Sequence, residues 1–380
     1  MQRSTFSFYD WHFSGEMQEL MDYANQKFDN ENWRSYGDWD VPQMSKSWNV
    51  MVDEYTQATR PVMLAPLAEK PIMDTTGFEW YSGRIPKMGH AIQFMETDIQ
   101  EFYELDIPQG ALLDKIREKW YTKMEACIQG FHTELNCMTY QALSTGMLNY
   151  TASGTNSIPV QIDYRVPAKH KLKALKQKWF SDTDWTPNEN ADPIKDLQRM
   201  CKIADNDGVP YDHFEMSKDL YDNFLMHPKV TAAVQARLVP AAASTTIYPM
   251  NNQEIVDVLM KVFSIPVIIP VDEKSKWNKL GVIEEAKPSF EKNTVVLVQS
   301  GQFFRIKNSP SMYLQDTNPA VRISSLEGER IAFLHQYSSE PYAEKSSGEL
   351  WACPVMKNPN NLIIMKVDEQ SNTGLQKVEP

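Results

Sequence analysis

About fifty consecutive residues, from Arg60 to Pro108, form an extended, turn-punctuated stretch that runs directly into a long amphipathic helix pattern. Prolines exclude a helix from its first part, because each lacks a backbone N–H and restricts the residue before it to extended geometry. These prolines are Pro61, Pro66, Pro71 and Pro86. Thr76-Gly77 and Ser82-Gly83 indicate turns. The pattern therefore predicts a long two-stranded excursion from the body of the protein.

This stretch is too apolar to be disordered and too long to be an ordinary loop. Loops beyond roughly a dozen residues are usually functional or disordered, and disorder requires low hydrophobicity. The large apolar side chains in the stretch are Met63, Leu64, Ile72, Met73, Phe78, Trp80 and Tyr81. We therefore interpret it as a projecting arm that packs on another subunit. Its expected contact residues are Phe78, Trp80, Tyr81, Arg84, Ile85 and Lys87.

A single long helix is predicted from about Gly110 to Gly146. From Leu113 onward, apolar residues recur at intervals of three or four, which is the spacing of one buried helical stripe. They include Ile116, Trp120, Met124, Cys127, Phe131, Leu135, Met138 and Ala142. Gly146 lies just past the pattern, where helices commonly end. The expected length is about 30 to 35 residues, or roughly 50 Å at 1.5 Å per residue.

The N-terminal region is rich in aromatic and acidic residues and contains one short helical pattern, near Glu16 to Phe28. Large aromatic rings need partners that bury them. We therefore interpret residues 1–59 as an N-terminal arm that lies on a neighbouring subunit. Its expected contact residues are Trp11, Trp33 and Trp39.

Beyond the long helix, the sequence predicts a strand, a lysine-rich helix, an α/β unit and a last group of strands. Residues 157–166 alternate as a strand, and the lysine-rich segment 169–178 follows as a short helix. Helices alternate with apolar strands from 192 to 318, which indicates an α/β unit. The last strands are expected to pack on the long helix, and they are predicted at 330–337, 350–356 and 362–367.

The composition indicates a folded protein without high affinity for nucleic acid. Hydrophobic residues make up 42% and charged residues 23% of the 380 residues, as in globular domains. The formal net charge of −12 opposes phosphate binding, which needs clustered lysine and arginine. For the lysine-rich segment, a solvated face is favoured over a nucleic-acid contact. No sequence-specific binding of nucleic acid is expected.

No membrane span, metal site or cofactor is predicted. No run of about 18 apolar residues occurs, and the N-terminus lacks the apolar core of a signal peptide, so synthesis in the cytoplasm is expected. The cysteines have neither the CxxC spacing nor the paired histidines of a zinc site. Free, reduced thiols are expected at Cys127, Cys137, Cys201 and Cys353.

The order and lengths of the segments resemble a known family. The residues that carry the resemblance are Gly83-Arg84-Ile85-Pro86, the strand from Ser157 to Arg165, Trp179, Asp192-Pro193-Ile194-x-Asp196-Leu197, Cys353-Pro354-Val355 and Asn358-Pro359-Asn360-Asn361. In this order they resemble the major capsid proteins of tailed bacteriophages with the Hong Kong 97-like fold, and most of all the lambda-type family, family E. The resemblance covers nearly the whole chain.

The resemblance implies an α+β fold and a division into five segments. These are an N-terminal arm (1–59), an extended E-loop (60–108), a P domain with a spine helix (109–191), an inserted α/β A domain (192–318), and P-domain return strands with a C-terminal tail (319–380). It also implies a virion protein, made in the bacterial host cytoplasm, that joins copies of itself into hexamers and pentamers of an icosahedral shell. Scaffolding, portal and decoration proteins would be its partners.

The acidic balance fits a shell around packaged double-stranded DNA. A container wall of like charge does not adhere to the polymer, so the DNA can slide during packaging. Strong affinity of the free subunit for DNA at moderate salt would contradict this hypothesis.

Some capsid proteins of this fold join an E-loop lysine to an asparagine of a neighbouring P domain by an isopeptide bond, aided by a carboxylate. Lys70 and Lys87 lie in the extended stretch here, and Asn358, Asn360 and Asn361 lie in a turn. Turn formation explains these asparagines, and nothing in the spacing selects a reactive triad. No cross-link is therefore expected.

The alternative function is that of a soluble hydrolase or carbohydrate-binding protein with an aromatic-rich N-terminal region. Acidic residues that could suggest a metal site are Asp182, Asp184, Asp205, Asp207 and Asp212, the last followed by His213. The first four lie in turn clusters, where such residues cap backbone groups. The sequence has no GxSxG, phosphate loop, HExxH or dinucleotide fingerprint. Particle mass would separate the two functions, because an enzyme stays a small oligomer.

Overall fold

The computed structural model describes residues 16–52, 79–104, 109–150, 159–181, 184–238, 251–275, 278–279, 282–283, 287–299, 301, 303–316, 321–340 and 342–371. Contacts divide the chain into two compact units. The first unit contains Met1–Trp48, Ser82–Thr139 and Phe304–Val355. The second unit contains Asn49–Tyr81, Tyr140–Phe303 and Met356–Pro380.

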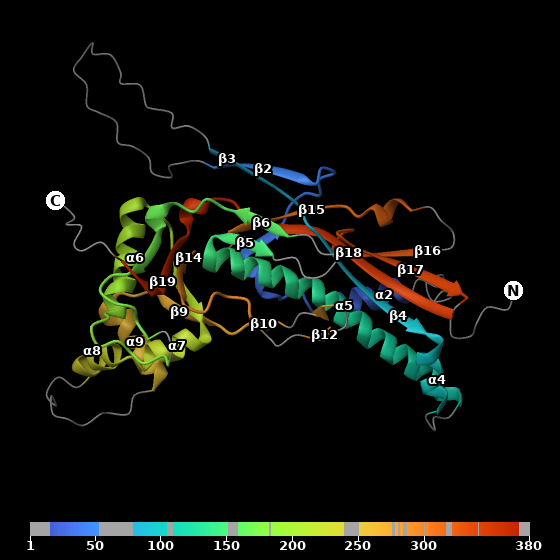
Figure 1. Cartoon of the computed structure of the whole chain (residues 1–380), viewed down its shortest axis with the longest axis horizontal. Coiled ribbons are helices and arrows are strands. Elements are labelled where there is room, and N and C mark those ends of the chain that lie inside the picture. The colour runs from blue at the N-terminus through green and yellow to red at the C-terminus, as the bar shows by residue number, and fades with distance from the viewer. Residues whose placement is uncertain are drawn as a thin grey trace, which may run out of the picture. The chain divides into compact units, whose positions relative to one another are not determined.

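A six-stranded sheet forms the centre of the first unit (Figure 1). Its strand order is β1 (Gly37–Trp39), β15 (Phe304–Ser309), β18 (Tyr342–Met356), β17 (Ile331–Ser339) and β16 (Val321–Leu326), and β4 (Lys87–Met95) also pairs with β18. β4 and β17 flank the same part of β18, since Ser346 is opposite both Ile92 and His335. β18 is therefore the central strand.

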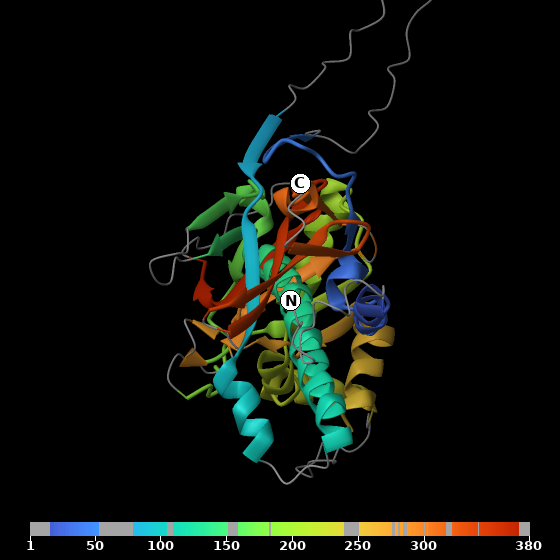
Figure 2. The ribbon, with the colours of Figure 1, turned by 90° about the vertical axis from the view of Figure 1, so that its right-hand side faces the viewer.

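Among the described residues, the first unit contains three helices and most of a fourth. They are α2 (Glu16–Gln26), α3 (Asn32–Tyr36), α4 (Glu96–Glu104) and α5 (Gln109–Thr145), with a short 3-10 helix η2 at Met312–Gln315. The last residues of α5, from Tyr140, belong to the second unit. Figure 2 shows α4 and the N-terminal end of α5 at the same end of the unit. The helix predicted near Glu16 to Phe28 is confirmed as α2.

The predicted long helix is confirmed as α5, which has 37 residues. Its apolar stripe is buried as expected, with Trp120, Met124 and Leu135 almost inaccessible to solvent. The helix ends where Gly146 adopts a left-handed conformation, with φ of 69°. The Gly146 N–H donates to the carbonyl of Ala142 at 2.9 Å. Glycine enters this conformation without the steric cost that a side chain brings.

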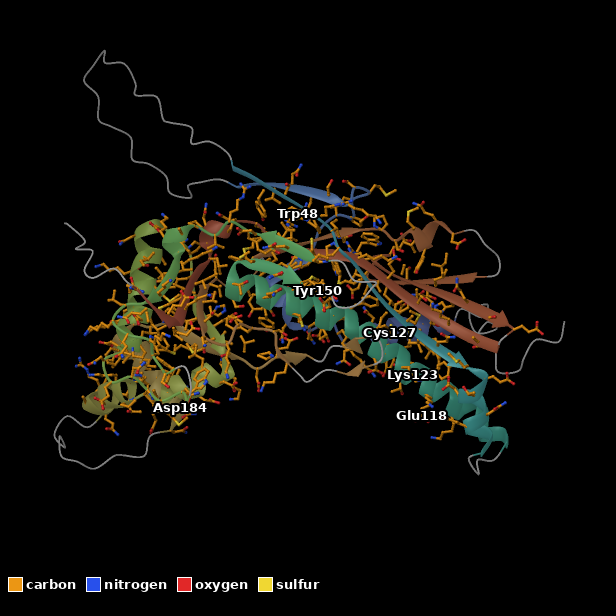
Figure 3. All side chains as sticks on the ribbon, viewed as in Figure 1. Trp48, Glu118, Lys123, Cys127, Tyr150 and Asp184 are labelled. Carbon is orange, nitrogen blue, oxygen red and sulfur yellow. The ribbon has the colours of Figure 1, made fainter. Side chains whose placement is uncertain are left out.

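α5 packs closely on the sheet through aromatic rings. Phe131 on α5 meets Phe333 on β17 edge to face, with 6.1 Å between ring centroids. Both rings lie against Gly348 of β18, where a Cβ atom would come within 2.8 Å of each ring. Further along α5, the Lys123 ammonium lies 4.6 Å from the centre of the Phe94 ring on β4; Figure 3 labels Lys123.

A two-stranded excursion is present as predicted, but it begins before Arg60, because its first strand lies in the segment assigned to the N-terminal arm. β2 (Ser47–Val52) pairs with β3 (Glu79–Arg84) in a two-stranded sheet. Residues 53–78, which join them, lie outside the described residues. Just beyond β3, the Ile85 N–H donates to the carbonyl of Lys46 at 2.8 Å, so the two ends of the excursion are held together at its root.

The second unit has its own five-stranded sheet. The strand order is β7 (Lys171–Ala174), β19 (Ile363–Gln370), β14 (Thr294–Val298), β8 (His213–Ser217) and β9 (Val267–Val271). Its helices are α6 (Pro193–Asp207), α7 (Lys218–Leu225), α8 (Pro228–Leu238) and α9 (Asn252–Phe263). Apolar residues from both layers form one core, including Leu197, Phe214, Leu259, Val295 and Met365.

Helix caps explain where two of these helices begin. Pro193 occupies the first turn of α6, and the Asp192 carboxylate accepts a hydrogen bond from the Lys195 N–H at 3.3 Å. The Ser217 hydroxyl accepts one from the Leu220 N–H at 3.4 Å at the start of α7. Both positions follow the known preference of aspartate and serine for helix N-termini.

The remaining elements are short. β5 (Met147–Tyr150) and β6 (Val160–Asp163) form a hairpin, which confirms the strand predicted at 157–166. Two further pairs are β10 (Lys274–Ser275) with β13 (Lys287–Pro288), and β11 (Asn278–Lys279) with β12 (Val282–Ile283). Two more 3-10 turns are η1 (Ala168–His170) and η3 (Pro359–Asn361).

Three predictions about organisation differ from the structure. The stretch 60–108 is not an extended loop throughout, because β4 joins the main sheet through β18 and α4 follows it as a helix. The lysine-rich segment is not a helix, because η1 and the edge strand β7 occupy it. The predicted A-domain boundaries, 192–318, also differ from the observed units. β7 and β19 lie outside this range yet complete the sheet of the second unit, whereas β15 lies inside it and pairs with β1 in the first unit. Pairing between strands distant in sequence causes the last two differences.

Candidate subunit interface

The root of the two-stranded excursion is fixed to β18 by a buried carboxylate. Glu349 accepts hydrogen bonds from the Ser311 hydroxyl at 2.9 Å and from the Trp351 indole, and it pairs with the Lys87 ammonium at the start of β4. Burial raises the pKa of Glu349, but these bonds outweigh burial and hold the pKa below its usual range. Glu349 is therefore charged at neutral pH and holds Lys87 in place.

A second lysine completes this root on the other side of the excursion. The Lys46 ammonium lies 3.0 Å from the centre of the Trp351 ring, a cation–π contact. Burial lowers the pKa of Lys46, and the second ammonium, Lys87, lowers it further, whereas Glu349 raises it. Because Lys46 precedes β2 and Lys87 follows β3, both ends of the excursion are bound to one segment of β18.

A close contact explains why a residue without a side chain occupies the first position of the Gly83-Arg84-Ile85-Pro86 sequence. A Cβ atom on Gly83 would come within 2.5 Å of the Trp48 ring, and Trp48 is buried at the start of β2 (Figure 3). Trp48 also forms a hydrogen bond with the Cys353 thiol. Burial raises the pKa of this thiol to about 12, although the hydrogen bond with Trp48 acts to lower it. Cys353 therefore remains an unreactive thiol.

The predicted contact residues of the excursion separate into two groups. Tyr81 and Ile85 are buried within the chain, and the Tyr81 hydroxyl donates to the carbonyl of Met356. Arg84 is exposed, and Lys87 is half-exposed although its ammonium pairs with Glu349. Phe78 lies outside the described residues, as does the side chain of Trp80. Arg84 is thus an exposed residue among the predicted contact residues, and its role as a contact stays a prediction.

The expectation that Trp33 needs a neighbouring subunit is wrong, because its own chain buries it to 1% exposure. The Trp33 N–H donates to the Asn136 side chain on α5 at 2.8 Å. Its indole N–H donates to His132 at 3.4 Å. Trp39 packs edge-on against Trp33 at 5.2 Å between ring centroids. Trp11 lies outside the described residues.

A network of polar side chains holds this part of the arm on the first unit. Glu327, in the turn between β16 and β17, accepts hydrogen bonds from Asn25 at 2.6 Å, from Arg34 at 2.7 Å and from the Trp39 indole at 2.9 Å. Burial raises the pKa of Glu327, but these bonds together lower it. His132 Nε2 lies 3.0 Å from the side-chain oxygen of Asn25. Burial lowers the pKa of His132 to about 4.

Sequence reasoning missed His132, Asn136 and Glu327. One signal was available, because His132 and Asn136 are polar residues four apart that interrupt the apolar side of α5. Such residues on a buried helix face need polar partners. Nothing in the sequence identifies Glu327 as that partner, since it is almost two hundred residues away.

The acidic residues considered for a metal site take structural roles. Asp205 accepts a hydrogen bond from the Tyr211 hydroxyl at 2.9 Å, and Asp207 pairs with Lys169 at 3.0 Å. His213 lies between Asp212 and Glu215, Asp184 lies in a turn, and Asp182 lies outside the described residues. Among the residues that the structure describes, no group of three or more potential ligands could hold a metal ion.

The residues considered for a cross-link also have local roles where they are described. The Asn358 side chain caps η3 by accepting a hydrogen bond from the Asn360 N–H at 3.0 Å. Lys87 pairs with Glu349, and Lys70 lies outside the described residues.

Within the described part of the chain, no helix is both long enough and apolar enough to cross a membrane.

Comparisons with solved structures identify the fold. A crystal structure of a candidate capsid protein from a prophage of E. coli CFT073 is 14% identical, covers 92% of this chain and 97% of its own, and gives a TM-score of 0.51. The satellite phage P4 procapsid with its size determination protein is 9% identical over 98% of this chain and 99% of that one, with a TM-score of 0.45. The cyanophage A-1(L) capsid is 10% identical over 90% and 92%, with a TM-score of 0.45.

The sequence itself identifies the family. A comparison with proteins of curated function gave no match. The profile of the family described as phage major capsid protein E matches residues 18–327, which is more than half of the chain. The chain therefore belongs to the phage major capsid protein E family and is a structural protein of the virion with the Hong Kong 97-like fold.

Proposed function

We propose that this capsid protein assembles with copies of itself, through hexamers and pentamers, into the icosahedral shell that encloses packaged double-stranded DNA. The observation that carries the proposal is the two-stranded excursion, β2 and β3, whose root is bound to β18 through Lys46, Lys87 and Glu349. A projecting element with an ordered root is suited to reach a neighbouring subunit in a fixed direction.

The contacts proposed for the shell come from the excursion and the arm. Phe78, Trp80 and Arg84 bind a neighbour from the excursion, and Trp11 does so from the arm. Burial of a large aromatic side chain contributes on the order of 1.5 to 3 kcal/mol before association costs. Repeated heterologous contacts that close on themselves form rings, which is how hexamers and pentamers arise.

In this assembly the first unit is the peripheral domain and the second unit is the axial domain. The protein is made in the bacterial host cytoplasm and acts as a wall component without catalysis. A scaffolding protein, a portal and decoration proteins are its proposed partners, in addition to other copies of itself. Contact with DNA is non-specific and weak, in keeping with the net charge of −12.

Negative-stain electron microscopy combined with light scattering tests the proposal. Purified full-length protein is expected to form closed shells, tubes or rings of six with masses in the megadalton range. The protein should be measured alone and after co-expression with the neighbouring phage genes, which would supply a scaffold. A monomer or dimer under both conditions would contradict self-assembly of the protein.

A further inference from the structure

The first unit exposes three apolar side chains beside the root of the excursion. Val41 is 79% exposed, Met44 is 74% exposed and Met312 is 64% exposed. A single exposed apolar residue is ordinary, but a group of them next to ordered polar residues marks an interaction site.

Backbone contacts place the segments that carry these side chains beside one another. The segment after β1 continues beside β15, because the Asp40 N–H donates to Ile306 and the Gln43 N–H donates to Asn308, each at 3.0 Å. Met312 follows Ser311, whose hydroxyl binds Glu349. The surface containing Val41, Met44 and Met312 therefore borders the root of the excursion.

Two cations, Lys46 and Arg84, lie at the root of the excursion that this apolar surface borders. Lys46 lies on the Trp351 ring, and Arg84 is exposed one residue before Ile85, which is bonded to Lys46. Two nearby carboxylates are already paired with lysines, Glu349 with Lys87 and Asp40, which precedes Val41, with Lys307. We name the surface formed by Val41, Met44, Lys46, Arg84 and Met312 the cationic patch. Its chemistry fits a partner surface that combines carboxylates with apolar groups.

The outer face of α2 has that combination. Glu19, Leu20, Asp22 and Tyr23 are exposed, and they form two adjacent pairs three residues apart on one side of the helix. We name these four residues the acidic patch. Tyr23 is 61% exposed, and the Lys27 ammonium 5.8 Å from its ring is paired with Glu125. Between Glu16 and Asp40 the chain has seven acidic residues, against Lys27 and Arg34 as the basic ones.

The acidic patch is held firmly on the first unit. The opposite side of α2 buries Met21 and Ala24. The Gln18 side chain donates to the carbonyl of Ser325 at 2.7 Å and accepts from its N–H at 3.2 Å, so it covers the backbone of β16. Because α2 is fixed in this way, its outer face can act as a rigid docking surface.

We propose that the cationic patch of one subunit binds the acidic patch of a second copy of this chain. The inference rests on the proposed self-assembly and names one of its interfaces. Opposite charges set the partner and its orientation, while the apolar side chains of the two patches exclude water from the contact. Because the patches are different surfaces, each subunit can bind one neighbour with each patch, and such head-to-tail contacts close into rings.

Intermolecular cross-linking tests this contact directly. A protein with both Met44→Cys and Tyr23→Cys is assembled, oxidised mildly with copper phenanthroline and run on a non-reducing denaturing gel. A ladder of disulfide-linked multimers is expected. The two single variants, Met44→Cys and Tyr23→Cys, are matched controls and are expected to remain monomeric. The native cysteines 127, 201 and 353 are buried, and the half-buried Cys137 is present in all three variants, so the single variants also control for its reaction.

The cross-linking outcomes separate this inference from the proposed function. If the double variant forms shells but remains monomeric on the gel, the pairing of the two patches is overturned, whereas self-assembly stands. If the wild-type protein forms no particles under any condition, the proposed function fails before the interface is tested.

Charge reversal provides an independent measurement. Arg84→Glu and Glu19→Lys are each expected to raise the protein concentration needed for assembly by about tenfold. The combination of both changes is expected to restore assembly, because the opposite charges meet again. Lys229→Glu makes the same charge change as Arg84→Glu, at an exposed lysine of α8, and should leave assembly unchanged. Circular dichroism melting confirms that each variant is folded. Failure of the combined variant to recover would overturn the inference.

Discussion

At the scale of single residues, close contacts decide which side chains are tolerated at the root of the excursion. Gly83→Ala places a methyl group where the Trp48 ring is 2.5 Å away. Because Trp48 is buried, the ring cannot move aside without disturbing its neighbours, and overpacking of this kind costs about 1 to 3 kcal/mol. We expect urea denaturation to show this loss in the free energy of unfolding.

The matched control for this prediction is Gly89→Ala in β4. There a Cβ atom meets only the carbonyl of Gly348, at an ordinary 3.5 Å. The change should leave the free energy of unfolding within about 0.5 kcal/mol of the wild type. Equal losses for the two substitutions would show that contact with Trp48 does not explain the result.

Residue-scale electrostatics also predict a pH dependence. His132 has its pKa lowered to about 4 by burial, from the value of about 6.5 expected in the unfolded chain. Between these values the unfolded state binds more protons than the folded state, so the free energy of unfolding falls as the pH falls. The stabilising effect of neutral His132 is present above about pH 6.5 and is lost as the pH approaches 4.

Thermal unfolding measured from pH 7 to pH 5 checks this prediction. The melting temperature of the wild type should fall across the range, and that of His132→Gln should fall less. Glutamine keeps a polar group opposite Asn25 but has no titrating group. An identical slope for both proteins would assign the acid sensitivity to other residues.

At the scale of elements, the docked arm behaves as part of the first unit. Trp33→Ala removes a fully buried indole that contacts α5, and such changes cost about 3 to 5 kcal/mol. The segment containing α2 and α3 should then open more often, so trypsin should cleave faster after Arg34. In unassembled subunits, Tyr23→Ala, at an exposed ring of the same arm, should leave the cleavage rate unchanged. If Trp33→Ala left the rate unchanged, Trp33 would not be needed to hold the arm.

The elements also show which parts of the fold a sequence can predict. α5 was predictable because its apolar residues repeat every three or four positions along one continuous segment. β7 was missed because its lysines suggested a helix, although lysine is also common on edge strands, where it discourages pairing with other chains. β8 and β15 were missed as well. The partners of β15 lie far away in the sequence. Directly before this strand, for example, the carbonyl of Phe303 accepts a hydrogen bond from the Lys357 N–H at 3.1 Å.

The candidate site was predictable only in part, for a similar reason. Arg84 could be identified because it lies in a Gly-x-x-Pro segment of a long stretch that is too apolar for a disordered loop. The attachment of Lys46 and Lys87 to β18 could not be predicted, because their partners Glu349 and Trp351 lie more than 250 residues further along the chain. The same limit explains why Trp33 was assigned to a neighbour: its aromatic character required burial, but the sequence did not reveal that α5 provides it.

At the scale of the whole molecule, the net charge of −12 predicts that the subunit has a low affinity for DNA. Proteins that bind DNA non-specifically reach dissociation constants of about 10⁻⁴ to 10⁻⁶ M at physiological salt by neutralising phosphates with clustered cations. The subunit has an excess of carboxylates, and several of its lysines are already paired, including Lys87, Lys169 and Lys307.

Free subunits should therefore show no saturable binding to a fluorescent DNA duplex below about 10⁻⁴ M, as measured by fluorescence anisotropy at moderate salt. Lowering the salt should strengthen binding only slightly, because few counterions would be released. A steep salt dependence with tight binding would instead indicate a concentrated basic surface, for which the lysines of β7 would be the first residues to test. DNA bound to such a surface could not slide freely during packaging. The hypothesis that the negative net charge keeps DNA from adhering to the shell would then be wrong.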